Sequence, residues 1–122
     1  MFGLFEKKKA TLIIEERNLG TYHFDLKSKN VLIGRSKSAF SKAHVIQGKD
    51  KIEFAHNEFT KRISPEQGSL IWNNSEKKYV FKDHSQHGTL VDGDPLEHGE
   101  ERTLEHNAQI IIHPFKLRVE YP

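Results

Sequence analysis

The alternation of apolar and charged residues with a period of two constrains this chain most. It is clearest near the C-terminus, where Lys116, Arg118 and Glu120 separate four apolar side chains, Phe115, Leu117, Val119 and Tyr121. Successive side chains of a β-strand point to opposite faces of a sheet, so this segment predicts a strand with one buried and one solvated face. The segment from Tyr22 to Leu26 alternates in the same way.

Short runs of β-branched and aromatic residues, separated by turn signals, occupy most of the remaining chain. We expect further strands at residues 11–14, 31–33, 52–54, 69–72, 79–81 and 110–112. Asp92-Gly93 predicts a tight type I′ hairpin turn, because both residue types tolerate positive φ. Residues 27–30 and 73–75 also predict reversals. Many short strands with turns between them predict an all-β fold, a twisted antiparallel β-sandwich of two packed sheets.

Two further expectations concern the loops and the core. Residues 36–51 lack a clear pattern, and we interpret them as a long loop with room for one helical turn. Loops of this length in compact domains are often functional. Phe54 and Trp72 are expected in the hydrophobic core.

The length and composition favour one globular domain and exclude several classes of site. A chain of 122 residues can bury one core. It has no cysteine, which excludes disulfides and thiolate metal sites and is consistent with a cytoplasmic location. The 19 basic and 17 acidic residues are mostly interspersed, so we expect no clustered basic face and no nucleic-acid partner. Neither a secretory signal nor a transmembrane segment is expected.

The N-terminus differs in composition from the remainder. We interpret residues 1–9 as a tail that packs or frays, and residues 10–122 as the sandwich domain. The alternative is a weak membrane foot, in which Phe2, Leu4 and Phe5 enter the membrane surface and the lysines at 7–9 contact anionic lipid.

Three polar motifs lie at the ends of predicted strands, at residues 33–35, 62–68 and 83–93. A phosphorylated threonine carries nearly two negative charges and three strong acceptor oxygens. A guanidinium and a hydroxyl are suitable donors for it, and Arg35 and Ser64 carry these groups in two of the motifs. We expect them to converge at one end of the sandwich.

These motifs resemble those of the forkhead-associated (FHA) family, and the resemblance covers roughly residues 12–121. The family has Gly-Arg after a strand, then Ser-x-x-His, then Asp-x-Ser-x-Asn-Gly-Thr-x-Val-Asn-Gly. The resemblance implies an FHA-like sandwich that binds phosphothreonine peptides without catalysis and without a cofactor. It also implies that Arg35, Ser64 and Gln86 contact the phosphate. His87 then orients the peptide backbone, and Arg62 favours an acidic residue at the third position after the phosphothreonine.

The chain departs from the family pattern at several loop positions. His87 replaces the family's asparagine, Gln67 replaces its histidine, and Pro65 removes a backbone N–H. These departures motivate an alternative, an FHA-like domain that binds a folded partner independently of phosphate. A third hypothesis, a metal-dependent enzyme, rests on the eight histidines, but their spacing matches no common metal motif. No metal site and no catalytic residue are therefore assigned, and neither the partner's identity nor the oligomeric state follows from the sequence.

Overall fold

The structure is a computed structural model that describes residues 7–38 and 44–122, and in these ranges it contains twelve strands and no helix. The strands are β1 (Ala10–Glu16), β2 (Gly20–Leu26), β3 (Asn30–Arg35), β4 (Val45–Gln47), β5 (Lys51–Phe54), β6 (Gly68–Asn73), β7 (Lys78–Asp83), β8 (Thr89–Val91), β9 (Asp94–Leu96), β10 (Glu101–Thr103), β11 (Gln109–Ile112) and β12 (Phe115–Glu120).

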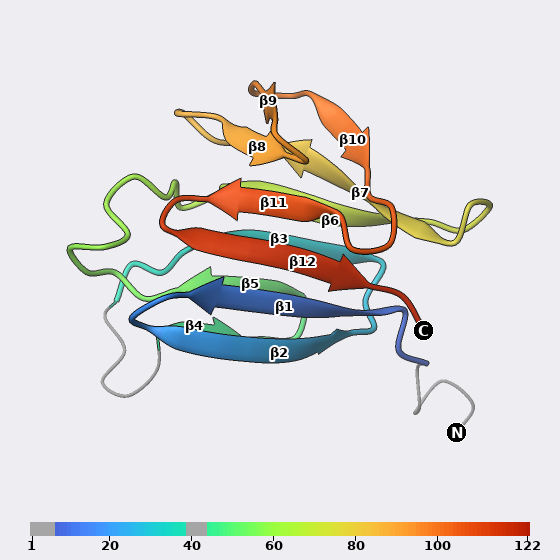
Figure 1. The fold of residues 1–122 in the computed structure, drawn as a ribbon, viewed down its shortest axis with the longest axis horizontal. Helices are drawn as coiled ribbons and strands as arrows, with labels where there is room; N and C mark the ends of the chain where they lie inside the picture. Colours follow the sequence, from blue (N-terminus) through green and yellow to red (C-terminus); the bar gives the residue numbers. More distant parts are fainter. Residues whose placement is uncertain (1–6, 39–43) are drawn as a thin grey trace.

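The strands form two six-stranded sheets that pack face to face (Figure 1). The first sheet has the order β2-β1-β12-β11-β8-β9, and the second has the order β10-β7-β6-β3-β5-β4. The predicted all-β sandwich is confirmed, and all neighbouring strands are antiparallel except β3 and β5. These two are parallel because β4 returns the chain along the outer edge of β5 before β5 pairs with β3.

The core lies between the two sheets, where the inward side chains of the alternating strands meet. Phe54 of the second sheet contacts Phe115 of the first, with ring centroids 4.5 Å apart. Both rings are almost fully buried, as expected for Phe54. The expectation for Trp72 is only partly met, because this side chain is half-buried at the margin of the core, edge-on to Tyr79.

The segment at residues 36–51 is not a continuous loop. Its described part contains β4, which pairs with β5 and buries Val45 opposite Phe54. A strand of three residues is too short to show a period of two, so the sequence pattern did not indicate it. No helical turn occurs in the described part, and residues 39–43 lie outside it.

The connections of the sandwich gather the polar motifs at one end. The β3–β4, β5–β6 and β7–β8 connections leave the second sheet at the same end, on the left in Figure 1, and the C-terminus lies at the other end. The β8–β9 turn has φ of 50° at Asp92 and 85° at Gly93, in agreement with the predicted hairpin. None of the described residues belongs to a helix that could cross a membrane.

Candidate functional site

Gly34 allows the end of β3 to lie directly against the β5–β6 connection. A Cβ atom at this position would lie 1.8 Å from the carbonyl oxygen of Pro65, so only glycine fits here. Two backbone hydrogen bonds flank the contact: the Arg35 N–H donates to Ser64 O at 3.1 Å, and the Gln67 N–H donates to Ile33 O at 2.8 Å. The close approach places Arg35 and Ser64 side by side.

Backbone carbonyls hold the guanidinium of Arg35. Its Nη1 donates to the carbonyl oxygens of Lys61 at 3.0 Å and Thr60 at 3.5 Å. Among the described residues, no carboxylate forms an ion pair with it. A guanidinium has five N–H donors, so this side chain keeps an unneutralised charge and further donors in a fixed position.

The hydroxyl of Ser64 connects the second motif to the third. Its Oγ accepts a hydrogen bond from the Gln86 N–H at 3.1 Å, and the residue is 8% exposed. No described acceptor takes the hydroxyl hydrogen of Ser64, so this hydrogen can be donated to a ligand.

Arg35, Ser64 and Gln86 line one hollow, which we call the Arg35 hollow. It also includes two lysines, Lys37 and Lys51, and a histidine, His84. Two carboxylates are present as well: Glu53, which pairs with Lys51 at 3.4 Å, and Glu66. The arrangement offers an anion one guanidinium, a hydroxyl and an exposed amide side chain.

The buried side chain of Gln67 connects the loops that surround this hollow. Its Oε1 accepts from the Ser64 N–H at 2.9 Å, and its Nε2 donates to Thr89 Oγ1 at 2.9 Å and to Gly88 O at 3.3 Å. The residue is 2% exposed. The amide of Gln67, which replaces the family histidine, therefore links the second motif to the third.

A buried carboxylate organises the third motif. Asp83 accepts from the hydroxyls of Ser85 at 2.8 Å and Thr89 at 2.6 Å, and Ser85 Oγ accepts from the Gly88 N–H at 2.8 Å. These bonds fix the tight loop that places Gln86 and His87 at the surface.

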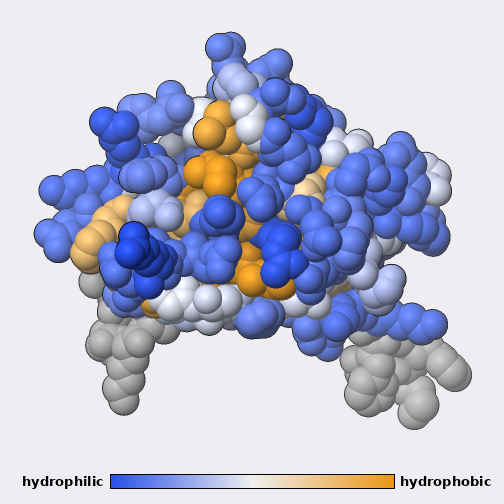
Figure 2. Space-filling model, in the orientation of Figure 1, coloured by the Kyte–Doolittle hydropathy of each residue, from blue (hydrophilic) through white to orange (hydrophobic). Residues whose placement is uncertain are grey.

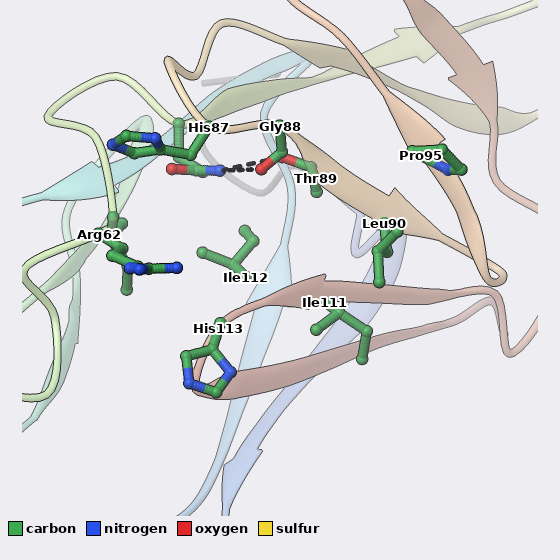
Figure 3. A pocket seen from close by; sticks show the side chains of 11 residues that line it. Arg62, His87, Gly88, Thr89, Leu90, Pro95, Ile111, Ile112 and His113 are labelled. Atoms are coloured by element: carbon green, nitrogen blue, oxygen red, sulfur yellow. Dashed lines mark hydrogen bonds between the residues drawn. The ribbon is translucent and has the colours of Figure 1, made fainter.

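Arg62 and His87 do not lie in the Arg35 hollow. They line a second one, the Leu90 hollow, with a volume of about 210 Å³ (Figure 3). Its floor is apolar, formed by Leu90, Ile111 and Pro95 among others. Figure 2 shows this hydrophobic surface over β8 and β11, surrounded by hydrophilic residues. Leu90 and Ile111 are cross-strand partners, and Leu90 is 41% exposed.

Sequence reasoning missed several lining residues. Lys37 and Lys51 lie in a segment interpreted as a loop, and no spacing linked them to Arg35. His84 occupies a variable position of the third motif, and its Nε2 lies 3.0 Å from Ser69 Oγ. As for metals, no group of three potential ligands is assembled within residues 7–38 and 44–122.

Comparison with protein families identifies the fold. Residues 31–113, more than half of the chain, match the family model described as FHA domain. The chain belongs to the FHA domain family. The matched range contains all three motifs and both hollows, so the resemblance inferred from the motifs is confirmed.

Solved FHA domains share this fold at low sequence identity. The FHA domain of the CT664 protein from Chlamydia trachomatis is 18% identical, with a TM-score of 0.63 over 93% of this chain and 97% of that one. An FHA domain from an analysis of phosphothreonine-dependent interactions is 15% identical, with a TM-score of 0.59 and coverages of 92% and 97%. Mycobacterium tuberculosis EmbR in complex with a low-affinity phosphopeptide is also 15% identical, with a TM-score of 0.60 and coverages of 92% and 24%. Comparison with curated protein sequences finds no match.

Proposed function

We propose that this FHA domain is a non-catalytic module that binds phosphothreonine-containing peptides or partner proteins through the Arg35 hollow. The observation that carries the proposal is the presence of Arg35, Ser64 and Gln86 in one hollow. Bonds within the loops hold the guanidinium and the hydroxyl in place, which lowers the entropy cost of binding a phosphate. The phosphopeptide complex of EmbR and the phosphothreonine-dependent FHA domain support the same assignment.

The Leu90 hollow is the proposed location for peptide residues after the phosphothreonine. Arg62 favours an acidic side chain there, and the apolar floor accommodates an aliphatic one. His87, at its edge, can donate to or accept from the peptide backbone. We further propose that residues 10–122 act as one domain, that residues 1–9 form its tail, and that the protein works in the cytoplasm.

Titration with matched peptide pools tests the proposal. The pools carry phosphothreonine, phosphoserine or threonine at one fixed position and are degenerate elsewhere. We expect binding of the phosphothreonine pool and little binding of the threonine pool. Arg35→Gln removes charge-assisted hydrogen bonds and is expected to weaken binding roughly 10- to 100-fold.

Arg102→Gln is the matched control, because Arg102 pairs with Asp94 and lines neither the Arg35 hollow nor the Leu90 hollow. It is expected to leave peptide affinity unchanged. Equal binding of the phosphothreonine and threonine pools, with no effect of Arg35→Gln, would show that the domain binds partners independently of phosphate. If the phosphoserine pool binds as tightly as the phosphothreonine pool, the phosphate site is supported and selectivity for threonine is rejected.

A further inference from the structure

A basic hollow lies near the end of the sandwich opposite the Arg35 hollow. Its volume is about 400 Å³, and two half-buried aromatic side chains, Trp72 and Tyr121, are part of its wall. Five lysines surround it: Lys7, Lys8, Lys9, Lys29 and Lys77. No aspartate or glutamate of the described chain lines it. The expectation that basic residues do not cluster is wrong here, because folding brings together lysines from three separate segments.

The folded domain fixes one of these lysines. The Lys9 N–H donates to Leu26 O at 2.7 Å, and Lys9 Nζ donates to Lys27 O at 2.8 Å. The same ammonium lies 5.9 Å from the centroid of the Trp72 ring. This cation–π contact covers part of the indole ring and joins the basic cluster to the aromatic wall.

The remaining lysines of this basic hollow are exposed and little neutralised by neighbouring carboxylates. Lys8 lies 3.9 Å from Asp25, which is itself well exposed. Lys77 donates to the neutral amide oxygen of Asn74 at 3.2 Å. In the described residues, no carboxylate forms an ion pair with Lys7, Lys9, Lys29 or Lys77.

We propose that this basic hollow docks the domain on an anionic membrane surface. Clusters of four to eight lysines or arginines bind anionic lipid headgroups. Tryptophan and tyrosine are enriched at the level of the headgroups. The apolar residues of the membrane foot considered from the sequence, Phe2, Leu4 and Phe5, precede these lysines in the chain and lie outside the described residues. Stable membrane association usually needs two such signals.

A single-stranded nucleic acid is the other polyanion that a basic and aromatic surface can bind. Such binding depends on bases stacking on open aromatic faces. Here Lys9 lies over Trp72, and Trp72 also packs against Tyr79 and Tyr121, with centroids 5.0 Å and 6.5 Å away. The geometry therefore favours the membrane.

Strand β6 runs from one site to the other (Figure 1). It begins at Gly68, which follows Gln67 of the loops around the Arg35 hollow, and it carries Trp72 of the basic hollow near its end at Asn73. A domain docked through the basic hollow would point its peptide-binding loops away from the lipid. The membrane proposal does not depend on the proposed phosphopeptide function, and either can fail alone.

Vesicle binding of the full chain tests this inference. The probes are vesicles of phosphatidylcholine alone and vesicles that also contain phosphatidylserine, read by co-sedimentation. We expect the chain to bind only the anionic vesicles. Added salt should weaken this binding, because the Debye length falls from roughly 10 Å at 0.1 M to 3 Å at 1 M ionic strength. Trp72 is the only tryptophan, so its fluorescence reports contact at this hollow directly.

Charge removal on two matched surfaces completes the experiment. Replacing Lys7, Lys8 and Lys29 together by glutamine should weaken binding to anionic vesicles on the order of 100-fold. Each lysine is expected to contribute a factor of about tenfold or less to this affinity. The control replaces three exposed lysines elsewhere, Lys49, Lys61 and Lys116, and should have a much smaller effect.

Three results would overturn the proposal. One is equal binding to neutral and anionic vesicles. Another is an equal loss in both triple variants, which would indicate net charge alone. The third is tight binding of a single-stranded oligonucleotide, with a Trp72 fluorescence change, when vesicles give neither. Unchanged thermal unfolding of both variants excludes misfolding as the cause of any loss.

Discussion

Gly34 determines how closely the end of β3 approaches the loop that carries Ser64. We predict that Gly34→Ala lowers the free energy of unfolding by about 1–3 kcal/mol, because the new methyl group overlaps the Pro65 carbonyl. The same displacement separates Arg35 from Ser64, so phosphopeptide affinity falls as well. Urea unfolding and peptide titration measure the two effects.

Gly48→Ala is the control for this substitution. Its Cβ would meet only side-chain carbons of Lys51, which can move, and its φ is not in the left-handed region. A Gly34→Ala protein that keeps both stability and peptide affinity would show that the close approach is not required.

Gln67 is the second residue on which the loop geometry depends. Gln67→Leu removes three hydrogen bonds and leaves the Ser64 N–H without its present acceptor. We predict a loss of about 2–4 kcal/mol in the free energy of unfolding, measured by urea titration. Gln67→His, the residue type of the family pattern, should retain more stability than Gln67→Leu. If the leucine variant is the more stable of the two, the bracing role is wrong.

The site residues show what a linear pattern can reveal at this scale. The motifs identified Arg35, Ser64 and Gln86, which line one hollow. They also named Arg62 for a residue after the phosphothreonine and His87 for the peptide backbone, and both line the neighbouring Leu90 hollow rather than the Arg35 hollow. Sequence spacing does not determine the face of a loop from which a side chain projects. That face is determined by hydrogen bonds between side chains and the backbone, such as the one that Arg35 Nη1 donates to Lys61 O.

In the β8–β9 hairpin, the energetic cost of backbone strain can be measured without any steric overlap. Gly93 has φ of 85°, and no atom lies within 4 Å of a Cβ built there. We therefore predict that Gly93→Ala costs about 1–2 kcal/mol, through the left-handed backbone conformation alone. In contrast to Gly34→Ala, peptide affinity should remain unchanged. Urea unfolding with a parallel peptide titration distinguishes the two substitutions, and a loss of affinity in Gly93→Ala would contradict this account.

Strand prediction succeeded where a period of two or a run of β-branched and aromatic residues marked the segment. Strands β1, β2 and β12 were predicted from apolar alternation or β-branched runs. Strands β4 and β10 have three residues each, and β10 is held by its pairing with β7. Such short segments become strands because a neighbour supplies hydrogen-bond partners, and that information is not local in the sequence.

Across the whole molecule, Tyr121 links the end of the first sheet to the second. Its hydroxyl donates to Leu104 O at 2.7 Å and accepts from the Tyr79 N–H at 2.9 Å. Tyr121→Phe removes both bonds and should lower the free energy of unfolding by about 1–3 kcal/mol near neutral pH.

The effect of Tyr121→Phe should depend on pH. Burial raises the pKa of the Tyr121 phenol above its ordinary value of 10. The unfolded chain therefore loses this proton first, and the contribution of the hydroxyl is present below pH 10 and lost as pH rises through the folded-state pKa. The stability difference between wild type and Tyr121→Phe should narrow at strongly alkaline pH in urea titrations. A difference that widens there would contradict the assignment.

The domain as a whole has two charged surfaces at opposite ends, joined by a rigid sandwich. The core was predictable because it follows from the residue pattern of the long strands. The basic hollow was predictable only in part. The run of lysines at 7–9 is visible in the sequence, but Lys29 and Lys77 join it only when the fold places the termini and two turns together. If both proposals hold, the domain can bind a phosphopeptide at one end while the other end contacts a membrane.

The most direct test of the phosphate site is the pattern of backbone amide shifts in an isotope-labelled protein. A phosphothreonine peptide selected from the pool is added, and its unphosphorylated counterpart serves as the reference. We predict the largest phosphate-dependent changes at the amides of Arg35, Ser64 and Gln86. Identical shift patterns for the two peptides, or phosphate-dependent changes that spare all three amides, would contradict the account.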